Sequence, residues 1–175
     1  RWCPGILAGD VIQCLGLTEP GSGSDVSGIQ ARARRDGDHW VLNGNKCYMS
    51  SGSKANLVYF VAKTDDDVKK GRGTMTAFLV DAKTPGVKLR RMDTIGMRAS
   101  GVGEGFFEDV RVPADCLLGT EGDALRSVLK GTFMLDRTII ATRAQAVAEL
   151  AFNLTLDYVK NRKVFGQSVF EFQNT

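Results

Sequence analysis

The sequence predicts an α+β protein: an antiparallel β-barrel or sandwich, followed by the helices of an incomplete helical bundle. Two observations lead to this prediction. Short β-rich runs separated by turn residues fill the chain to about residue 113, whereas an apolar stripe with helical spacing follows residue 119. The composition fits a globular protein, since 43% of the 175 residues are hydrophobic and 25% are charged.

The β-rich part begins after a short opening segment. Residues 1–10 indicate the frayed end of a helix followed by a loop, and an apolar run at residues 11–15 leads into a glycine-rich loop. Turns are expected at residues 36–38, 69–73 and 84–86, and Asp36-Gly37 is a hairpin signal. The strands expected beyond the glycine-rich loop cover residues 40–42, 57–62, 75–80, 87–89 and 105–110.

Two charged segments in this part are interpreted as surface. Residues 65–71 form a charged loop to which we assign no chemistry. Arg32, Arg34 and Arg35 are interpreted as the solvated face of a strand rather than as a site for a polyanion.

The helical part shows apolar residues at i, i+3, i+4 and i+7 spacing from Ile140 to Leu154. The spacing predicts helices at about residues 121–134 and 137–162, with Arg137 near the joint. Such a stripe is more typical of a core or a subunit interface than of a cofactor site. Lys160, Arg162 and Lys163 crowd the expected helix end, where cations complement the helix dipole.

Charge and cysteine usage exclude several classes. The net charge is +3 with both signs interspersed, so nothing indicates nucleic-acid binding. The four cysteines lie far apart and there is one histidine, which argues against a metal site and favours free thiols in a reducing compartment. No apolar run of 18 residues and no secretory leader is found, so we expect a soluble protein without a membrane span.

The most informative segment is the loop at residues 16–28, in which glycines alternate with serines and a threonine. Glycines let backbone N–H groups approach a bound oxyanion, and the hydroxyls add donors for phosphate or flavin heteroatoms. The alternative is an ordinary turn between two strands.

Three blocks carry a family resemblance. Residues 16–25 resemble the flavin-binding loop of the acyl-CoA dehydrogenase family, Gly/Ala-aliphatic-Thr-Glu-Pro-Gly-x-Gly-Ser-Asp. Residues 43–52 resemble its Asn-Gly-x-Lys-x-aromatic-aliphatic-Ser/Thr-Asn-Gly block, with Ser51 where relatives carry Asn. Residues 162–167 and 172–173 resemble its Arg-x-x-Phe-Gly and Phe-Gln blocks. The likeness covers nearly the whole chain.

The resemblance implies a piece of a three-part subunit. Residues 1–12 would be the tail of an N-terminal helical domain, 13–118 the β middle domain, and 119–175 the first helices of a C-terminal helical domain that is cut short. It also implies FAD, an acyl-CoA substrate, a homodimer or homotetramer, and electron-transfer flavoprotein as acceptor. A bacterial cytoplasm or the mitochondrial matrix would be the location. A non-catalytic flavin-binding or scaffolding homologue and an acyl-CoA or nitroalkane oxidase remain as alternatives.

The resemblance also implies roles for individual residues. The flavin ring would be lined by Leu15, Leu17 and Thr18. The alternative for Thr18 is an ordinary β-branched strand residue. Ser24 would reach the FAD pyrophosphate and border the acyl-CoA channel, or be a turn hydroxyl. Tyr48 would pack on the face of the flavin ring, or be a core aromatic, and Ser50 would lie near N5. Arg162, Phe165 and Gln173 would bind the ADP half of FAD in the neighbouring subunit. The alternative for Arg162 is a cation at a helix end.

The catalytic base is the open part of this set. In most of the family it is a glutamate of a Tyr-Glu-Gly block, expected beyond residue 175, so that the fragment alone would be inactive. A minority places a glutamate just before the arginine that corresponds to Arg137, and here Asp136 stands at that position. Asp136 is therefore a candidate base, or a carboxylate at the acyl-CoA entry or beside Arg137, and Arg137 is expected near the substrate.

Overall fold

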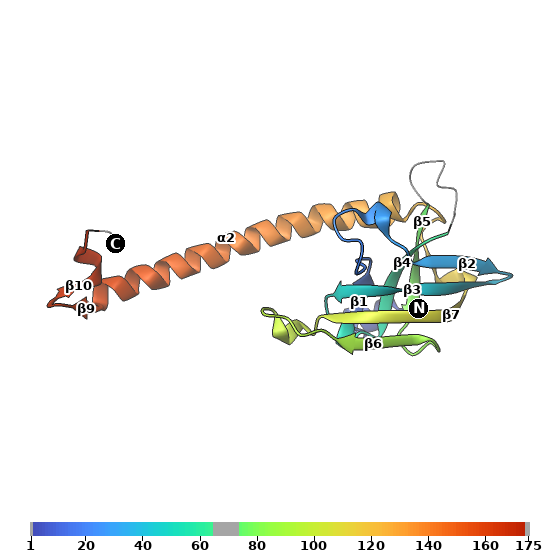
Figure 1. Ribbon diagram of the computed structural model, residues 1–175, viewed down its shortest axis with the longest axis horizontal. Coiled ribbons are helices and arrows are strands. Elements are labelled where there is room, and N and C mark those ends of the chain that lie inside the picture. Colours follow the sequence, from blue (N-terminus) through green and yellow to red (C-terminus); the bar gives the residue numbers. More distant parts are fainter. Residues whose placement is uncertain (1, 65–73, 174–175) are drawn as a thin grey trace. The chain divides into compact units, whose positions relative to one another are not determined.

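The computed structural model describes residues 2–64 and 74–173, so the predicted charged loop at 65–71 and the predicted turn at 69–73 lie outside the described residues (Figure 1). The chain forms two compact units, Arg1–Leu129 and Lys130–Thr175. Strands dominate the first unit and one helix dominates the second, which confirms the α+β prediction.

The described strands of the first unit form one eight-stranded sheet with the order β6-β7-β3-β2-β4-β5-β8, to which β1 is added through β4. Among these strands, the two end strands β6 and β8 do not pair with each other, so no such pairing closes the sheet into a barrel. A short helix, α1 (Cys3–Ala8), precedes the sheet. The strands are β1 (Gln13–Gly16), β2 (Arg32–Asp36), β3 (His39–Met49), β4 (Leu57–Lys63), β5 (Met75–Asp81), β6 (Val87–Arg91), β7 (Gly103–Pro113) and β8 (Leu117–Leu118).

The hairpin between β2 and β3 forms where Asp36-Gly37 predicts it. Asp36 pairs with His39, and Gly37 at the tip has a φ of 62°, a left-handed conformation that suits glycine. Arg32, Arg34 and Arg35 of β2 are exposed, as expected for a solvated strand face.

Strand β4 has two partners along one edge. β1 pairs with its first half in parallel, from Gln13 with Leu57 to Gly16 with Phe60. β2 touches its last residue, where Arg32 pairs with Lys63. β5 follows the opposite edge in antiparallel register. The glycine-rich loop between β1 and β2 therefore starts and ends beside the same strand.

The core of the first unit is aromatic. The rings of Trp40 and Phe78 meet edge to face with centroids 5.3 Å apart, and those of Phe60 and Phe107 lie 4.3 Å apart. All four side chains are buried, and aromatic pairs in these geometries add to the free energy that burial contributes.

The second unit begins with α2 (Lys130–Asn161) and ends in the hairpin β9 (Lys163–Val164) and β10 (Gln167–Ser168). The predicted joint near Arg137 is wrong, because α2 runs through it without a break. No glycine or proline occurs between residues 132 and 161, so nothing in the sequence interrupts the helical hydrogen bonds. A π-helical turn over Leu125–Leu129 precedes α2.

The apolar stripe of α2 is exposed in this single chain, for example at Ile140, Val147 and Leu154. Of the helices in the described part, none is long and apolar enough to cross a membrane. Among the described residues, Cys3, Cys14, Cys47 and Cys116 form no disulfide.

Candidate functional site

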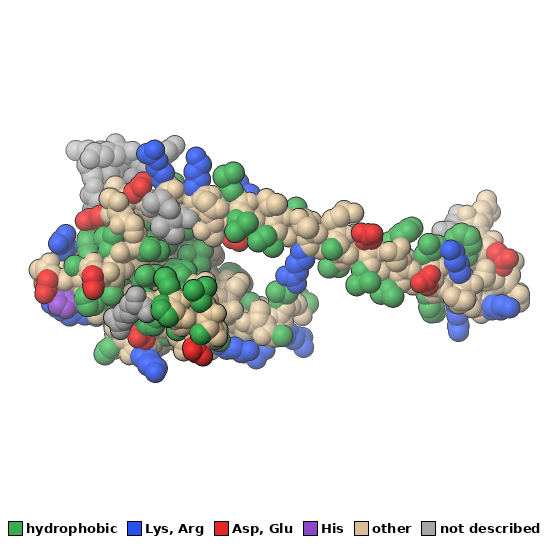
Figure 2. Space-filling model, turned by 180° about the vertical axis from the view of Figure 1, so that it is seen from behind, with side chains coloured by type: hydrophobic (Ala, Val, Ile, Leu, Met, Phe, Trp, Pro, Cys, Tyr) green, Lys and Arg blue, Asp and Glu red, His purple; other side chains and the backbone are tan. Residues whose placement is uncertain are grey.

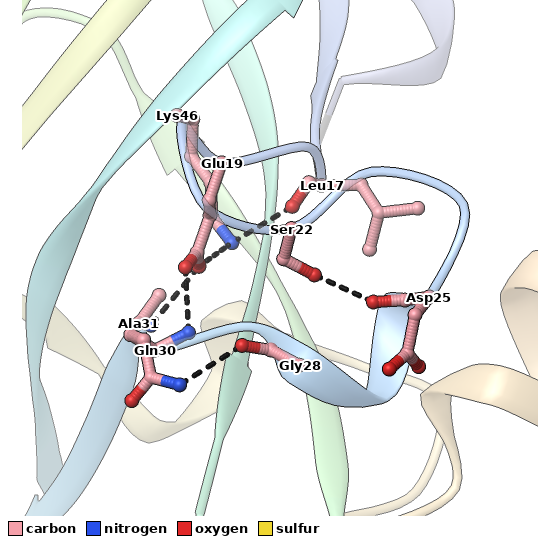
Figure 3. Close-up of polar contacts among 8 residues, drawn as sticks. All are labelled: Leu17, Glu19, Ser22, Asp25, Gly28, Gln30, Ala31 and Lys46. Carbon is pink, nitrogen blue, oxygen red and sulfur yellow. Dashed lines mark hydrogen bonds and ion pairs between the residues drawn. The ribbon is translucent and has the colours of Figure 1, made fainter.

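The glycine-rich loop holds itself together through its own polar groups. Glu19 and Ser22 exchange both backbone hydrogen bonds, at 2.9 and 3.1 Å. The Ser22 hydroxyl donates to the carbonyl of Asp25 at 2.6 Å (Figure 3), and the Asp25 carboxylate accepts from the N–H and hydroxyl of Ser27. Within the described part of the chain, the hydroxyls of Thr18 and Ser24 take part in none of these bonds, and Ser24 is exposed.

A buried ion pair lies beneath this loop (Figure 3). Lys46 of β3 places its Nζ 2.7 Å from Oε1 of Glu19, and the two side chains are 0% and 6% exposed. The same Nζ donates to the carbonyl of Leu17 at 3.1 Å. Glu19 in turn accepts from the N–H groups of Gln30 and Ala31, at 2.5 and 3.0 Å. One lysine and one glutamate thus join both ends of the loop to the sheet.

Burial and pairing act against each other on both groups. Burial alone would raise the pKa of Glu19, but the hydrogen bond from Lys46 and those from the N–H groups of Gln30 and Ala31 hold this pKa below its usual value. Burial lowers the pKa of Lys46, and the Glu19 carboxylate opposes that shift. Glu19 is therefore ionised at neutral pH.

The sequence alone predicts no role for Glu19 or Lys46. The available signal was periodicity: along β3, Trp40 and Leu42 point inward at alternate positions, and Lys46 falls on the same alternation. A lysine on the buried face of a strand needs an acidic partner, and Glu19 is the glutamate inside the adjoining loop motif.

The Tyr48–Ser50 segment adjoins Thr18. The N–H of Cys47 donates to the carbonyl of Thr18 at 2.9 Å, which joins this end of β3 to the loop. Lys46 pairs with Gly105 and Met49 with Gly103, so β3 carries one extra residue and bulges here. Tyr48, inside the bulge, has a φ of 54° and a side chain that is 66% exposed.

An exposed aromatic residue held at positive φ is costly, and such strain is concentrated at ligand sites. Of the residues predicted to contact a flavin here, Ser24, Tyr48 and Ser50 are exposed and Thr18 is half-buried. Leu15 is half-buried and Leu17 is buried, so these two offer less surface.

These residues suit a flavin nucleotide. A flat heteroaromatic ring needs an aromatic or apolar wall and donors along its polar edge, which Tyr48, Thr18 and Ser50 offer. A diphosphate needs open backbone and hydroxyl groups. Ideal Cβ positions built at Gly21 and Gly23 meet nothing within 4 Å, so this stretch of backbone is accessible. A groove of about 470 Å³ adjoins the loop and is lined by Glu19, Pro20, Gly21, Gly28, Gln30, Ala31, Gly44 and Asn45.

The other predicted site residues belong to the second unit. Phe165 and Gly166 form the two-residue turn between β9 and β10 with φ of 53° and 85°, and Phe165 is 94% exposed. Next to this hairpin, the carbonyl of Arg162 accepts from the N–H of Val169 at 2.8 Å. Gln173 comes after this hairpin in the sequence and is exposed.

Asp136 and Arg137 are exposed on α2. As neighbours in a helix their side chains point about 100° apart. In the part of the chain that the structure describes, no ion pair joins them, and no group of His, Cys, Asp or Glu side chains is arranged to hold a metal ion.

Comparison with known proteins covers both units. Residues 14–110 match the family model of the acyl-CoA dehydrogenase middle domain, and residues 126–175 match that of the acyl-CoA dehydrogenase C-terminal domain. The mouse mitochondrial long-chain specific acyl-CoA dehydrogenase is 37% identical over 174 residues, 99% of this chain and 40% of that protein.

Two solved structures are similar over nearly all of the chain. An acyl-CoA dehydrogenase from Geobacillus kaustophilus has a TM-score of 0.92 and 38% identity, covering 98% of this chain and 45% of that one. A glutaryl-CoA dehydrogenase from Mycobacterium smegmatis in complex with FADH2 has a TM-score of 0.87 and 34% identity, covering 98% and 42%. The chain spans about two fifths of the length of the curated relatives it matches.

Proposed function

Since this chain belongs to the acyl-CoA dehydrogenase family, we propose that its full protein binds FAD and oxidises acyl-CoA thioesters between the α and β carbons. One structural observation supports this most directly: the hydrogen bond from Cys47 to Thr18 joins the glycine-rich loop to the end of β3 that carries the exposed Tyr48.

In this proposal the residues of the first unit hold the cofactor. Tyr48 covers one face of the ring, while the hydroxyls of Thr18 and Ser50 donate to its polar edge. Ser24 and the open backbone at Gly21 and Gly23 receive the diphosphate. When bound, FAD supplies the acceptor for the hydride that leaves the β carbon.

Proton removal at the α carbon needs a carboxylate within about 3 Å of that proton. Asp136 is the candidate that this chain offers, with Arg137 beside it to attract the anionic substrate. Aspartate is shorter than glutamate by one methylene, so the reach of Asp136 is the condition on which this role depends. The enolate charge that develops on the thioester oxygen requires hydrogen-bond donors held in place beforehand.

Arg162, Phe165 and Gln173 are proposed to bind the ADP half of FAD in a neighbouring subunit. A homo-oligomer, dimer or tetramer, would then be needed for full cofactor affinity, and the 175-residue segment alone would be inactive. Electron-transfer flavoprotein is the proposed acceptor, and the mitochondrial matrix or a bacterial cytoplasm the proposed location.

The test is anaerobic addition of acyl-CoA thioesters of several chain lengths to the full, FAD-loaded protein. Bleaching of the flavin absorbance is expected with at least one of them. An unchanged spectrum at every chain length would refute the proposal. Rapid reoxidation of the reduced flavin by dioxygen would indicate an oxidase rather than a dehydrogenase.

Variants refine the test. Thr18→Val and Ser50→Ala are expected to weaken FAD binding about tenfold each, the value of a lost hydrogen bond, whereas Thr84→Val in the β5–β6 turn leaves it unchanged. Asp136→Asn should abolish bleaching if Asp136 is the base. Full bleaching by this variant would assign the base to another carboxylate.

A further inference from the structure

The buried ion pair beneath the glycine-rich loop does more than join two segments. We propose that Lys46 and Glu19 are positioning residues of the flavin site: Lys46 fixes the peptide group that precedes Thr18, and Glu19 holds Lys46 and the far end of the loop, so that the N–H and hydroxyl of Thr18 face the cofactor. This inference rests on the proposed FAD-binding function, and it concerns residues to which that function alone gives no task.

The first step is the orientation of one peptide. In a trans peptide the C=O and the following N–H point in opposite directions. The Leu17 carbonyl points at Nζ of Lys46, 3.1 Å away, so the N–H of Thr18 points away from the buried lysine. Among the residues that the structure describes, none accepts a hydrogen bond from this N–H. Lys46 therefore leaves a fixed, available donor at Thr18.

The second step is the next peptide along the chain. Its carbonyl, on Thr18, accepts from the N–H of Cys47 at 2.9 Å. Its N–H, on Glu19, donates to the carbonyl of Ser22 at 2.9 Å. Both peptides that flank Thr18 are thus held by strand β3 or by the loop itself, and rotation of the Thr18 backbone would break bonds on either side.

Glu19 also holds the far end of the loop. Its carboxylate accepts hydrogen bonds from the N–H groups of Gln30 and Ala31, directly before β2 (Figure 3). Loss of the pair would remove one anchor from each stem of the loop. Lys46 also stands two residues before Tyr48 on β3, so one strand segment sets the positions of the donor at Thr18 and of the exposed aromatic ring.

Figure 2 shows, by contrast, lysine and arginine side chains that extend from the surface. One exposed pair is that of Lys88 with Glu108, at 3.3 Å, in which the two side chains are 70% and 69% exposed. This pair joins β6 to β7, and within the described residues no hydrogen bond or ion pair links either side chain to the loop. Lys88→Met is therefore a matched control for Lys46→Met.

The experiment measures FAD affinity and unfolding midpoint in parallel on the full protein. The variants are Lys46→Met, Glu19→Gln and the double variant Lys46→Met/Glu19→Gln, with Lys88→Met as control. Apoprotein is titrated with FAD, and flavin fluorescence and the position of the bound-flavin absorption band are recorded at a temperature where circular dichroism shows each variant folded.

The double variant separates positioning from stability. It leaves no unpaired buried charge, so its unfolding midpoint should return towards that of the parent. It still lacks the donor to Leu17, so its FAD dissociation constant should stay at least about tenfold raised, with a displaced flavin band. Glu19→Gln, which keeps Lys46 on Leu17, should lose less affinity than Lys46→Met.

Two results would overturn the inference: a double variant that regains affinity and band position together with stability, or a Lys46→Met protein that binds FAD as tightly as the Lys88→Met control. A parent protein that takes up no FAD would instead refute the proposed function itself, and the positioning role with it.

Discussion

Replacement of Lys46 by methionine tests how strongly the buried ion pair stabilises the first unit. The substitution keeps an unbranched side chain, one atom shorter, but leaves the Glu19 carboxylate, 6% exposed, without its cation. Removing one partner of a buried pair costs about 3–5 kcal/mol, whereas an exposed pair is worth about 0–1 kcal/mol. For Lys46→Met we expect a loss of about 4 kcal/mol, and for Lys88→Met about 0.5 kcal/mol or less.

Urea unfolding followed by tryptophan fluorescence is a suitable assay, because both tryptophans, Trp2 and Trp40, lie in the first unit. With a slope of about 2 kcal/mol per molar urea, the expected loss for Lys46→Met lowers the midpoint by about 2 M. A midpoint within about 0.3 M of that of Lys88→Met would refute the reasoning, since a pair worth so little cannot be the buried, fully bonded one described here.

Three further predictions concern acid stability and backbone strain. The pKa of Glu19 is lower in the folded than in the unfolded protein, so ionised Glu19 stabilises the fold fully above about pH 4.3, and this stabilisation is lost as the pH falls through the folded pKa. The urea midpoint of Glu19→Gln should therefore change less with pH than that of the parent between about pH 3 and 6. In Gly44→Ala, the new Cβ would lie 2.6 Å from Cβ of Ala31 at a φ of +150°, so a loss of about 2–3 kcal/mol is expected by the same urea assay. Phe165→Asn would place Asn-Gly in the β9–β10 turn and relieve the positive φ of an exposed phenylalanine. We expect it to stabilise the second unit by about 1 kcal/mol, measured by thermal unfolding followed by circular dichroism. FAD affinity should fall if Phe165 makes the proposed contact with the cofactor.

Much of the fold could be predicted from local signals. The strands lie where β-rich runs predict them, and the Asp36-Gly37 turn forms the expected hairpin because its residues allow that conformation and few others. The Gly/Ser loop also lies where the motif predicts, between β1 and β2. These features depend on short stretches of sequence, so periodicity and turn chemistry suffice to find them.

The features that were missed depend on distant partners or on the absence of a signal. Glu19 and Lys46 are 27 residues apart, and neither residue alone specifies the other. Tyr48 has no intrinsic preference for positive φ, and its conformation comes from the bulge in the pairing of β3 with β7. The joint expected at Arg137 had no glycine or proline to support it, and the helix is continuous there.

The shared edge of β4 has a consequence for how this site can change. The loop leaves the sheet beside Phe60 and returns beside Lys63, so its two stems are separated by about 10 Å along one rigid strand. Exchange or lengthening of the sequence between Glu19 and Gln30 would keep the buried pair of Glu19 with Lys46 and leave every strand pairing in place, at an entropic cost that grows only slowly with length. A loop anchored in this way is suited to divergence: new specificities can be sampled in it while the sheet stays the same.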